Sequence, residues 1–131
     1  LSLTNVPFDS HTISSFLKSG GTAEEVEYYV ATSPDNKIIG LSAFENDLIK
    51  GFEVIGMVVD VNYRDKGIGR ALLAEGIEIA RKKGFRAINI SVFADNKPML
   101  LLLIKMDFKP TKIEYHARFD GEDIIHLKKY I

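Results

Sequence analysis

The sequence contains no cysteine among its 131 residues. This absence excludes disulfide bonds, thiolate metal sites and any reaction that passes through an acylated cysteine. It is compatible with the cytoplasm, where we expect the protein to act. We expect no metal centre either, because the histidines and carboxylates show no cluster with the spacing of metal ligands.

Long apolar runs and an excess of one charge are also missing. The longest apolar run, from Met99 to Ile104, is far shorter than the roughly 20 residues that span a bilayer, and the start of the chain lacks a signal-peptide pattern. The formal net charge of −1 gives no support for a nucleic-acid or membrane surface. With 46% apolar and 27% charged residues, the composition is typical of a soluble domain with one core.

The length predicts a single domain over residues 1–131, without repeats or linkers. The chain begins at Leu1 rather than at Met, which leaves open whether residues precede it.

The hydrophobic pattern predicts an α/β domain with a mixed sheet and helices on its faces. Asn96 is a suitable helix cap ahead of Pro98, and Asp120-Gly121 is a strong signal for a two-residue hairpin turn. The predicted order is a helix over residues 9–18, strands over 25–31, 37–44 and 52–59, a helix over 70–83, a strand over 85–93, a helix from 96 to about 106, and strands over 113–119 and 123–130.

The segment that joins the third predicted strand to the following helix has the features of a phosphate-binding loop. Gly67 and Gly69 leave the backbone bare, so successive N–H groups can approach an anion at the helix N-terminus. Arg64, Lys66 and Arg70 add the positive charge that a diphosphate requires. Two glycines alone are more often a plain turn. Other phosphate loops fit poorly, because the third glycine of a dinucleotide loop and the Gly-Lys-Ser/Thr ending of a nucleotide triphosphatase loop are missing.

The pattern Arg64-x-x-Gly67-x-Gly69, preceded by Tyr63 and followed by a Leu-Leu helix, resembles the coenzyme A pyrophosphate loop of the GNAT N-acetyltransferases. Val61 stands where that family often has proline. The resemblance covers about residues 25–131. The N-terminal part looks abbreviated, because the family commonly has a first strand and two helices there.

A second segment, from Asn96 to Phe108, resembles the family's later motif Asn-x-x-Ala-x-x-Leu-Tyr-x-x-x-Gly-Phe. Met99, Leu103 and Asp107 replace its alanine, tyrosine and glycine. The resemblance implies a mixed, mostly antiparallel twisted sheet flanked by helices, in which the strands that end near positions 59 and 92 splay apart around the thioester of acetyl-CoA.

The resemblance also implies the cofactor-binding residues. The backbone of residues 57–59 would hydrogen-bond the pantetheine arm, the backbone of residues 65–70 would hold the pyrophosphate, and positions 96 and 103 would lie beside the cofactor. The full set is Met57, Val58, Val59, Arg64, Asp65, Lys66, Gly67, Ile68, Gly69, Arg70, Asn96 and Leu103.

Direct transfer in a ternary complex, without an acyl-enzyme, is the implied mechanism. An amine attacks a thioester only when neutral, so a base helps. Glu53 lies eleven residues before Arg64, the offset of the catalytic glutamate in the histone-acetylating branch of the family, and is the candidate base. A solvated strand glutamate is the competing interpretation.

The general acid is left open. Most relatives have a tyrosine where this chain has Leu103, and leucine cannot donate a proton. Tyr115 and His116 are alternative donors, although packing is the more common role of a hairpin tyrosine. His11 and His126 show no partner spacing and are predicted to be structural or exposed.

The resemblance therefore implies an N-acetyltransferase that moves an acetyl group from acetyl-CoA to a primary amine: a protein N-terminus, a lysine side chain or a small amine. A module that binds acetyl-CoA without efficient catalysis is the alternative that Leu103 keeps open, and unrelated nucleotide binding is a third reading. A closing hairpin can join a neighbour's sheet edge, so a homodimer also stays open.

Overall fold

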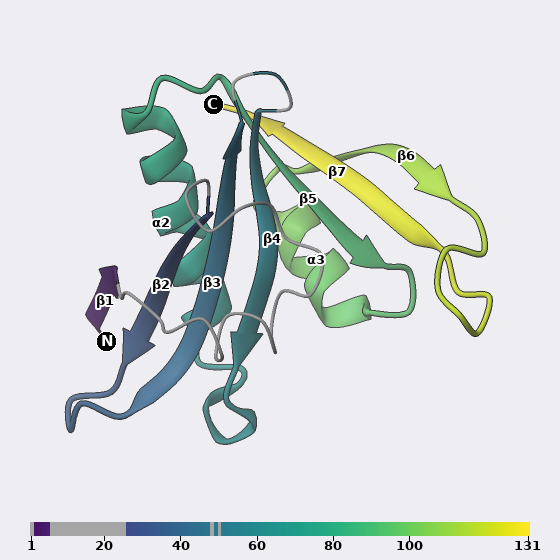
Figure 1. Ribbon diagram of the computed structural model, residues 1–131. Coiled ribbons are helices and arrows are strands. Elements are labelled where there is room, and N and C mark those ends of the chain that lie inside the picture. Colours follow the sequence, from purple (N-terminus) through teal and green to yellow (C-terminus); the bar gives the residue numbers. More distant parts are fainter. Residues whose placement is uncertain (1, 6–25, 48, 50) are drawn as a thin grey trace.

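The computed structural model describes residues 2–5, 26–47, 49 and 51–131, and within them one sheet carries two α-helices on it (Figure 1). The sheet order is β1-β2-β3-β4-β5-β7-β6. Its strands are β1 (Ser2–Asn5), β2 (Val26–Thr32), β3 (Ile38–Asp47), β4 (Gly51–Val59), β5 (Ala87–Phe93), β6 (Lys109–Glu114) and β7 (Ile124–Tyr130). The helices are α2 (Ile68–Lys82) and α3 (Lys97–Lys105), with a short 3₁₀ helix, η2 (Val61–Tyr63), ahead of α2.

The sheet is mixed, as predicted. β4 and β5 run parallel, and every other neighbouring pair is antiparallel. β1, which the sequence analysis did not predict, pairs with β2. The helix predicted over residues 9–18 lies outside the described residues. In the part of the chain that is described, no helix is both long and apolar enough to cross a bilayer.

The closing hairpin corrects the prediction of a two-residue turn. β6 ends at Glu114 and β7 begins at Ile124, so residues 115–123 connect them. Gly121 does close a turn, because its N–H donates to the Arg118 carbonyl at 2.8 Å, but this turn lies inside the longer connection. His116 has a φ of 56°, a left-handed conformation that a strand cannot continue through, and the strand predicted over 113–119 instead spans Lys109–Glu114.

The largest hydrophobic cluster of the described residues lies between the sheet and both helices, which cover the same face (Figure 1). α2 contributes Leu73 and Ile77, and α3 contributes Leu103, to the same cluster of buried side chains. Gly76 allows α2 to approach the sheet closely, because a Cβ at this position would lie 2.7 Å from the buried ring of Phe44.

A bulge in β4 explains why the central strands diverge. Ala43 of β3 pairs with Gly56, whereas Phe44 pairs with Val54, so Ile55 is an extra residue on β4. A bulge bends its strand and raises the local twist. β5 pairs with β4 only from Phe52 to Val54, and beyond that point the two strands separate (Figure 1). The expected splayed strand pair is thus confirmed.

Candidate active site

A cleft with a volume of about 210 Å³ lies where β4 and β5 separate. Its walls are mostly apolar, and its polar side chains are those of Ser91 and Asn96. The residues that line it are Val54, Ile55, Gly56, Met57, Ile90, Ser91, Val92, Phe93, Asn96, Met99 and Ile124.

The β4 backbone beyond the bulge has one free edge next to this cleft. Met57, Val58 and Val59 pair with β3 on one side. On the other side the ladder to β5 has ended at Val54, so within the described sheet no strand pairs with that edge. An extended ligand can add to such an edge through main-chain hydrogen bonds.

The predicted phosphate loop has the backbone geometry of an anion site. Asp65 and Gly67 both have positive φ, 61° and 80°, and Gly67 is the N-cap of α2 without a side chain to cap it. The first intrahelical bond runs from the Ala71 N–H to the Gly67 carbonyl at 3.0 Å. The N–H groups of residues 68–70 therefore have no intrahelical acceptor and lie at the positive end of the helix dipole.

The structure also brings the predicted cations to this loop. Arg64, Lys66 and Arg70 are exposed, and the Arg64 Nε donates to the Val59 carbonyl at 3.4 Å. Lys37, from the turn between β2 and β3, joins them: its Nζ lies 5.7 Å from the centre of the Tyr63 ring, and the Lys66 Nζ lies 5.4 Å from it. The sequence does not mark Lys37 as part of this loop, because Lys37 is distant along the chain.

The two positions from the second motif have different surroundings. The Asn96 side chain accepts from the Met99 N–H at 3.3 Å, which confirms its capping of α3, and Asn96 lines the cleft. Leu103 is fully buried in the core near Phe108 and is not among the cleft-lining residues. The structure thus places this leucine in the core rather than at the cleft surface.

A second pocket, of about 280 Å³, lies against the sheet face that α2 and α3 leave uncovered. Its lining residues are Glu53, Asn89, Ile90, Ser91, Thr111, Lys112, His126, Leu127 and Lys128. Glu53 pairs in register with Asn89 at the last part of the β4–β5 ladder, and it lines this pocket but not the cleft. Ile90 and Ser91 line both and so form the shared wall.

His126, predicted to be structural or exposed, has two side-chain partners that the sequence did not indicate. Its Nδ1 lies 2.7 Å from the Ser91 Oγ, and its Nε2 lies 2.5 Å from an Oε1 of Glu114. The three side chains come from β5, β7 and β6. No local spacing could have revealed them, because only the strand register brings positions 91, 114 and 126 together.

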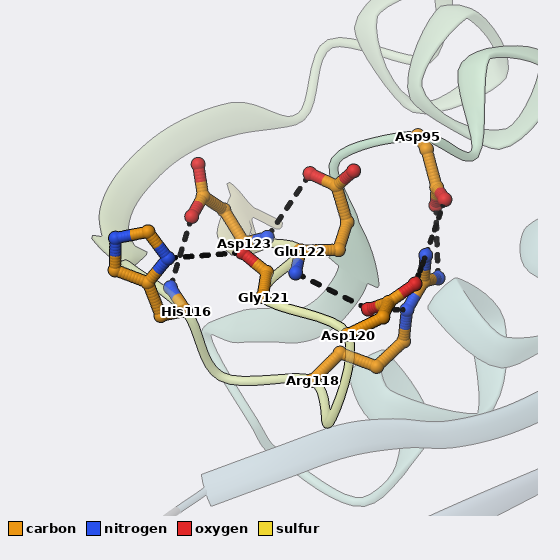
Figure 2. A network of polar contacts seen from close by, with 7 residues as sticks. All are labelled: Asp95, His116, Arg118, Asp120, Gly121, Glu122 and Asp123. Atoms are coloured by element: carbon orange, nitrogen blue, oxygen red, sulfur yellow. Dashed lines mark hydrogen bonds and ion pairs between the residues drawn. The ribbon is translucent and has the colours of Figure 1, made fainter.

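Polar contacts hold the loop between β6 and β7 in place, as Figure 2 shows. Arg118 makes paired contacts to Asp95, at 3.1 and 2.5 Å, and to Asp120, at 2.8 and 2.9 Å. Its Cζ also lies 4.8 Å from the ring centre of Phe93, a cleft residue. The hydrogen bonds from Arg118 lower the pKa of Asp120 to about 2 and lower the pKa of Asp95.

The two alternative proton donors belong to this loop and do not line the cleft. Tyr115 is 71% exposed. His116 faces its own loop: its Nδ1 lies 3.1 Å from the Gly121 carbonyl oxygen, and its N–H donates to Asp123 at 3.0 Å (Figure 2). Neither Tyr115 nor His116 lines the cleft between β4 and β5.

Comparison with known proteins agrees with this geometry. The model of the acetyltransferase (GNAT) family matches residues 4–108. An N-alpha-acetyltransferase from Sulfurisphaera tokodaii is 36% identical over 78 residues, which are 58% of this chain and 46% of the relative. The chain spans about half the length, or less, of the curated relatives that it matches.

Solved structures agree in fold. An IAA acetyltransferase from Bacillus cereus superposes with a TM-score of 0.84 at 19% identity over 99% of both chains. An acetyltransferase from Bacillus subtilis in complex with CoA gives a TM-score of 0.84 at 19% identity over 98% of this chain and 97% of the other. With the family match extending over most of its length, this chain belongs to the GNAT family of acetyltransferases.

Proposed function

We propose that this protein is an acetyl-CoA-dependent N-acetyltransferase that transfers the acetyl group directly to a primary amine in a ternary complex. One observation carries the proposal. A positively charged loop suited to binding an anion, a strand edge that no described strand pairs with, and an apolar cleft follow one another along β4 and its connection to α2. A coenzyme A thioester needs these three features in this order, from its diphosphate through its pantetheine arm to its acyl group.

In this proposal the N–H groups of residues 65–70 and the side chains of Arg64 and Arg70 hold the diphosphate. The backbone of Met57, Val58 and Val59 pairs with the amides of the pantetheine arm as an added strand would. The acetyl group then reaches the cleft, where Asn96 and Ser91 are the polar wall residues.

The acceptor enters from the pocket that contains Glu53, because this pocket is adjacent to the cleft and shares the lining residues Ile90 and Ser91 with it. A lysine-type amine with a pKa near 10.4 must lose a proton at about 4–5 kcal/mol at pH 7 before it attacks. Glu53 takes that proton, directly or through water. The relative named N-alpha-acetyltransferase makes a peptide α-amine the first acceptor to try, and such an amine is easier to deprotonate. The cytoplasmic location and a homodimer stay predictions.

The binding half of the proposal is tested by calorimetric titration with acetyl-CoA. In an Arg64→Ala/Arg70→Ala variant we expect the Kd to rise about 100-fold or more, because hydrogen bonds to charged groups contribute about 1.5–3 kcal/mol each. The matched control is Arg81→Ala/Arg86→Ala, which removes the same charge from exposed arginines outside the loop. Equal losses in both variants, or no saturable binding by the wild type, would contradict the loop assignment.

The burial of Leu103 favours a second candidate, a module that binds acetyl-CoA without efficient catalysis. Glu53→Gln separates the two candidates in an assay of amine-dependent CoA release. An enzyme with Glu53 as its base loses about 100-fold in kcat and keeps its Kd for acetyl-CoA. Glu45→Gln is the control, because Glu45 lies directly opposite Glu53 on β3 without lining the pocket. A wild type without amine-dependent release over a broad acceptor panel would favour the binding module.

A further inference from the structure

Ser91 is the polar residue that lines both spaces of the site. Of the described residues that line the cleft, only Ile90 and Ser91 also line the pocket that contains His126. A group at this wall can contact the thioester on one side and an internal partner on the other. The Ser91 hydroxyl has that partner, because it lies 2.7 Å from the Nδ1 of His126.

The strand register holds this contact in place. Ser91 and His126 are directly opposite residues of the antiparallel pair β5–β7. Glu114 completes the line from β6, with its Oε1 2.5 Å from the His126 Nε2. A carboxylate can only accept, so Nε2 carries a proton and Nδ1 is the nitrogen that exchanges a proton with Ser91.

We propose that Ser91, His126 and Glu114 form a proton relay that protonates the departing thiolate of coenzyme A. The inference rests on the proposed function and deepens it. It supplies the donor for which position 103 has only leucine.

In the step itself, the C–S bond of the tetrahedral adduct breaks and its electron pair moves to sulfur. The sulfur takes the hydroxyl proton of Ser91, and the Ser91 oxygen takes the Nδ1 proton of imidazolium His126. His126 is left neutral, with its Nε2–H still donated to Glu114. The protons that the amine loses go separately to Glu53 and solvent, so the two transfers do not compete for one group.

Solvent access allows the relay to be recharged after each turnover. The side chains of His126 and Glu114 are 31% and 43% exposed, so His126 can regain its proton from water. The charged groups around it are Glu114 and Lys112 on β6, Lys128 on its own strand and Glu53 on β4.

The test measures kcat, the Kd for acetyl-CoA and the pH profile in four variants of the full chain. Ser91→Ala and His126→Gln should each lower kcat about 100-fold, the low end of general acid–base effects, and leave the Kd within about two-fold. Ser91→Thr, which keeps a hydroxyl, should retain most of the activity. Tyr130→Phe removes a hydroxyl from the exposed end of the strand that carries His126, outside the cleft and the pocket, and should change kcat by less than about two-fold.

The pH profile distinguishes a relay from a merely structural contact. Wild-type kcat should fall on the alkaline side as imidazolium is lost, and His126→Gln should lose that limb of the profile. The relay is overturned if Ser91→Ala or His126→Gln keeps near wild-type kcat, if Kd rises in step with the fall in kcat, or if an acetyl group accumulates on Ser91. An inactive wild type would instead overturn the proposed function, and with it the relay.

Discussion

The two arms of the sheet, β1–β4 and β5–β7, contribute to the site in different ways. On the first arm the site is mainly backbone: the free edge of residues 57–59 and the N–H groups at the start of α2. On the second arm it is side chains, with Ser91, Glu114 and His126 brought together from three strands. The first arm is suited to binding a long, extended ligand along its backbone. The second arm is suited to transferring a proton to one atom of that ligand.

The arms are joined through very little of the sheet. Three register pairs connect β4 to β5, from Phe52↔Ile88 to Val54↔Ile90, and the Asn89 side chain adds a hydrogen bond to the Phe52 carbonyl at 3.2 Å. Below the sheet, both arms share one apolar core. This arrangement leaves the cleft open while the core holds its two sides, so we expect that ligand binding and proton transfer can be altered separately.

The largest expected effect comes from that shared core. Leu103→Ala removes a fully buried side chain that packs in the cluster common to both arms, and should lower the free energy of unfolding by about 2–5 kcal/mol. Urea unfolding followed by circular dichroism measures it. Leu101→Ala is the control, because Leu101 is on the same helix and 60% exposed. Equal losses of unfolding free energy in both variants would mean that the packing of Leu103 in the shared core does not hold the two arms together.

The first arm was the more predictable one because its signals are contiguous. The loop around Gly67 and the helical stripe of α2 each depend on residues close along the chain, and the structure confirms those elements. The strand splay was expected only through the family resemblance. Its physical cause, the extra residue Ile55 on β4, is visible only in the register with β3.

The second arm was less predictable because it depends on distant residues. Asp120-Gly121 looked like a complete hairpin turn, but Arg118 pairs with Asp95, 23 positions earlier in the chain, and this contact holds a longer loop instead. His126 looked isolated because its partners lie on two other strands. Leu103 stands where the family motif has tyrosine, and the packing of α3 buries it in the core.

A smaller effect is expected at the junction of the arms. Asn89→Ala removes the hydrogen bond to the Phe52 carbonyl and should lower the free energy of unfolding by about 1 kcal/mol, the usual net value of one such bond. Thermal unfolding with and without acetyl-CoA measures it. If the side-chain bond helps to set the splay, the variant should also lose part of the stabilisation by acetyl-CoA. An unchanged midpoint would show that the three ladder pairs and the core suffice.

The smallest effect concerns the loop of the second arm. Hydrogen bonds from Arg118 hold the pKa of Asp120 at about 2 and lower that of Asp95, so their stabilisation is present above the ordinary aspartate pKa, about 3.9, and is lost as the pH falls toward about 2. Carboxyl NMR titration should therefore show the loop contacts weakening between about pH 4 and pH 2.

In Arg118→Ala the pKa of Asp120 should return toward its ordinary value. In Arg118→Lys this pKa should be lowered only in part, because lysine lacks the planar fork of arginine. The Kd for acetyl-CoA should be unchanged in both, since neither Arg118 nor Asp120 lines the cleft or belongs to the loop before α2. A pKa of Asp120 that does not respond to Arg118→Ala would show that the backbone of the turn, rather than the ion pair, holds the loop beside the cleft.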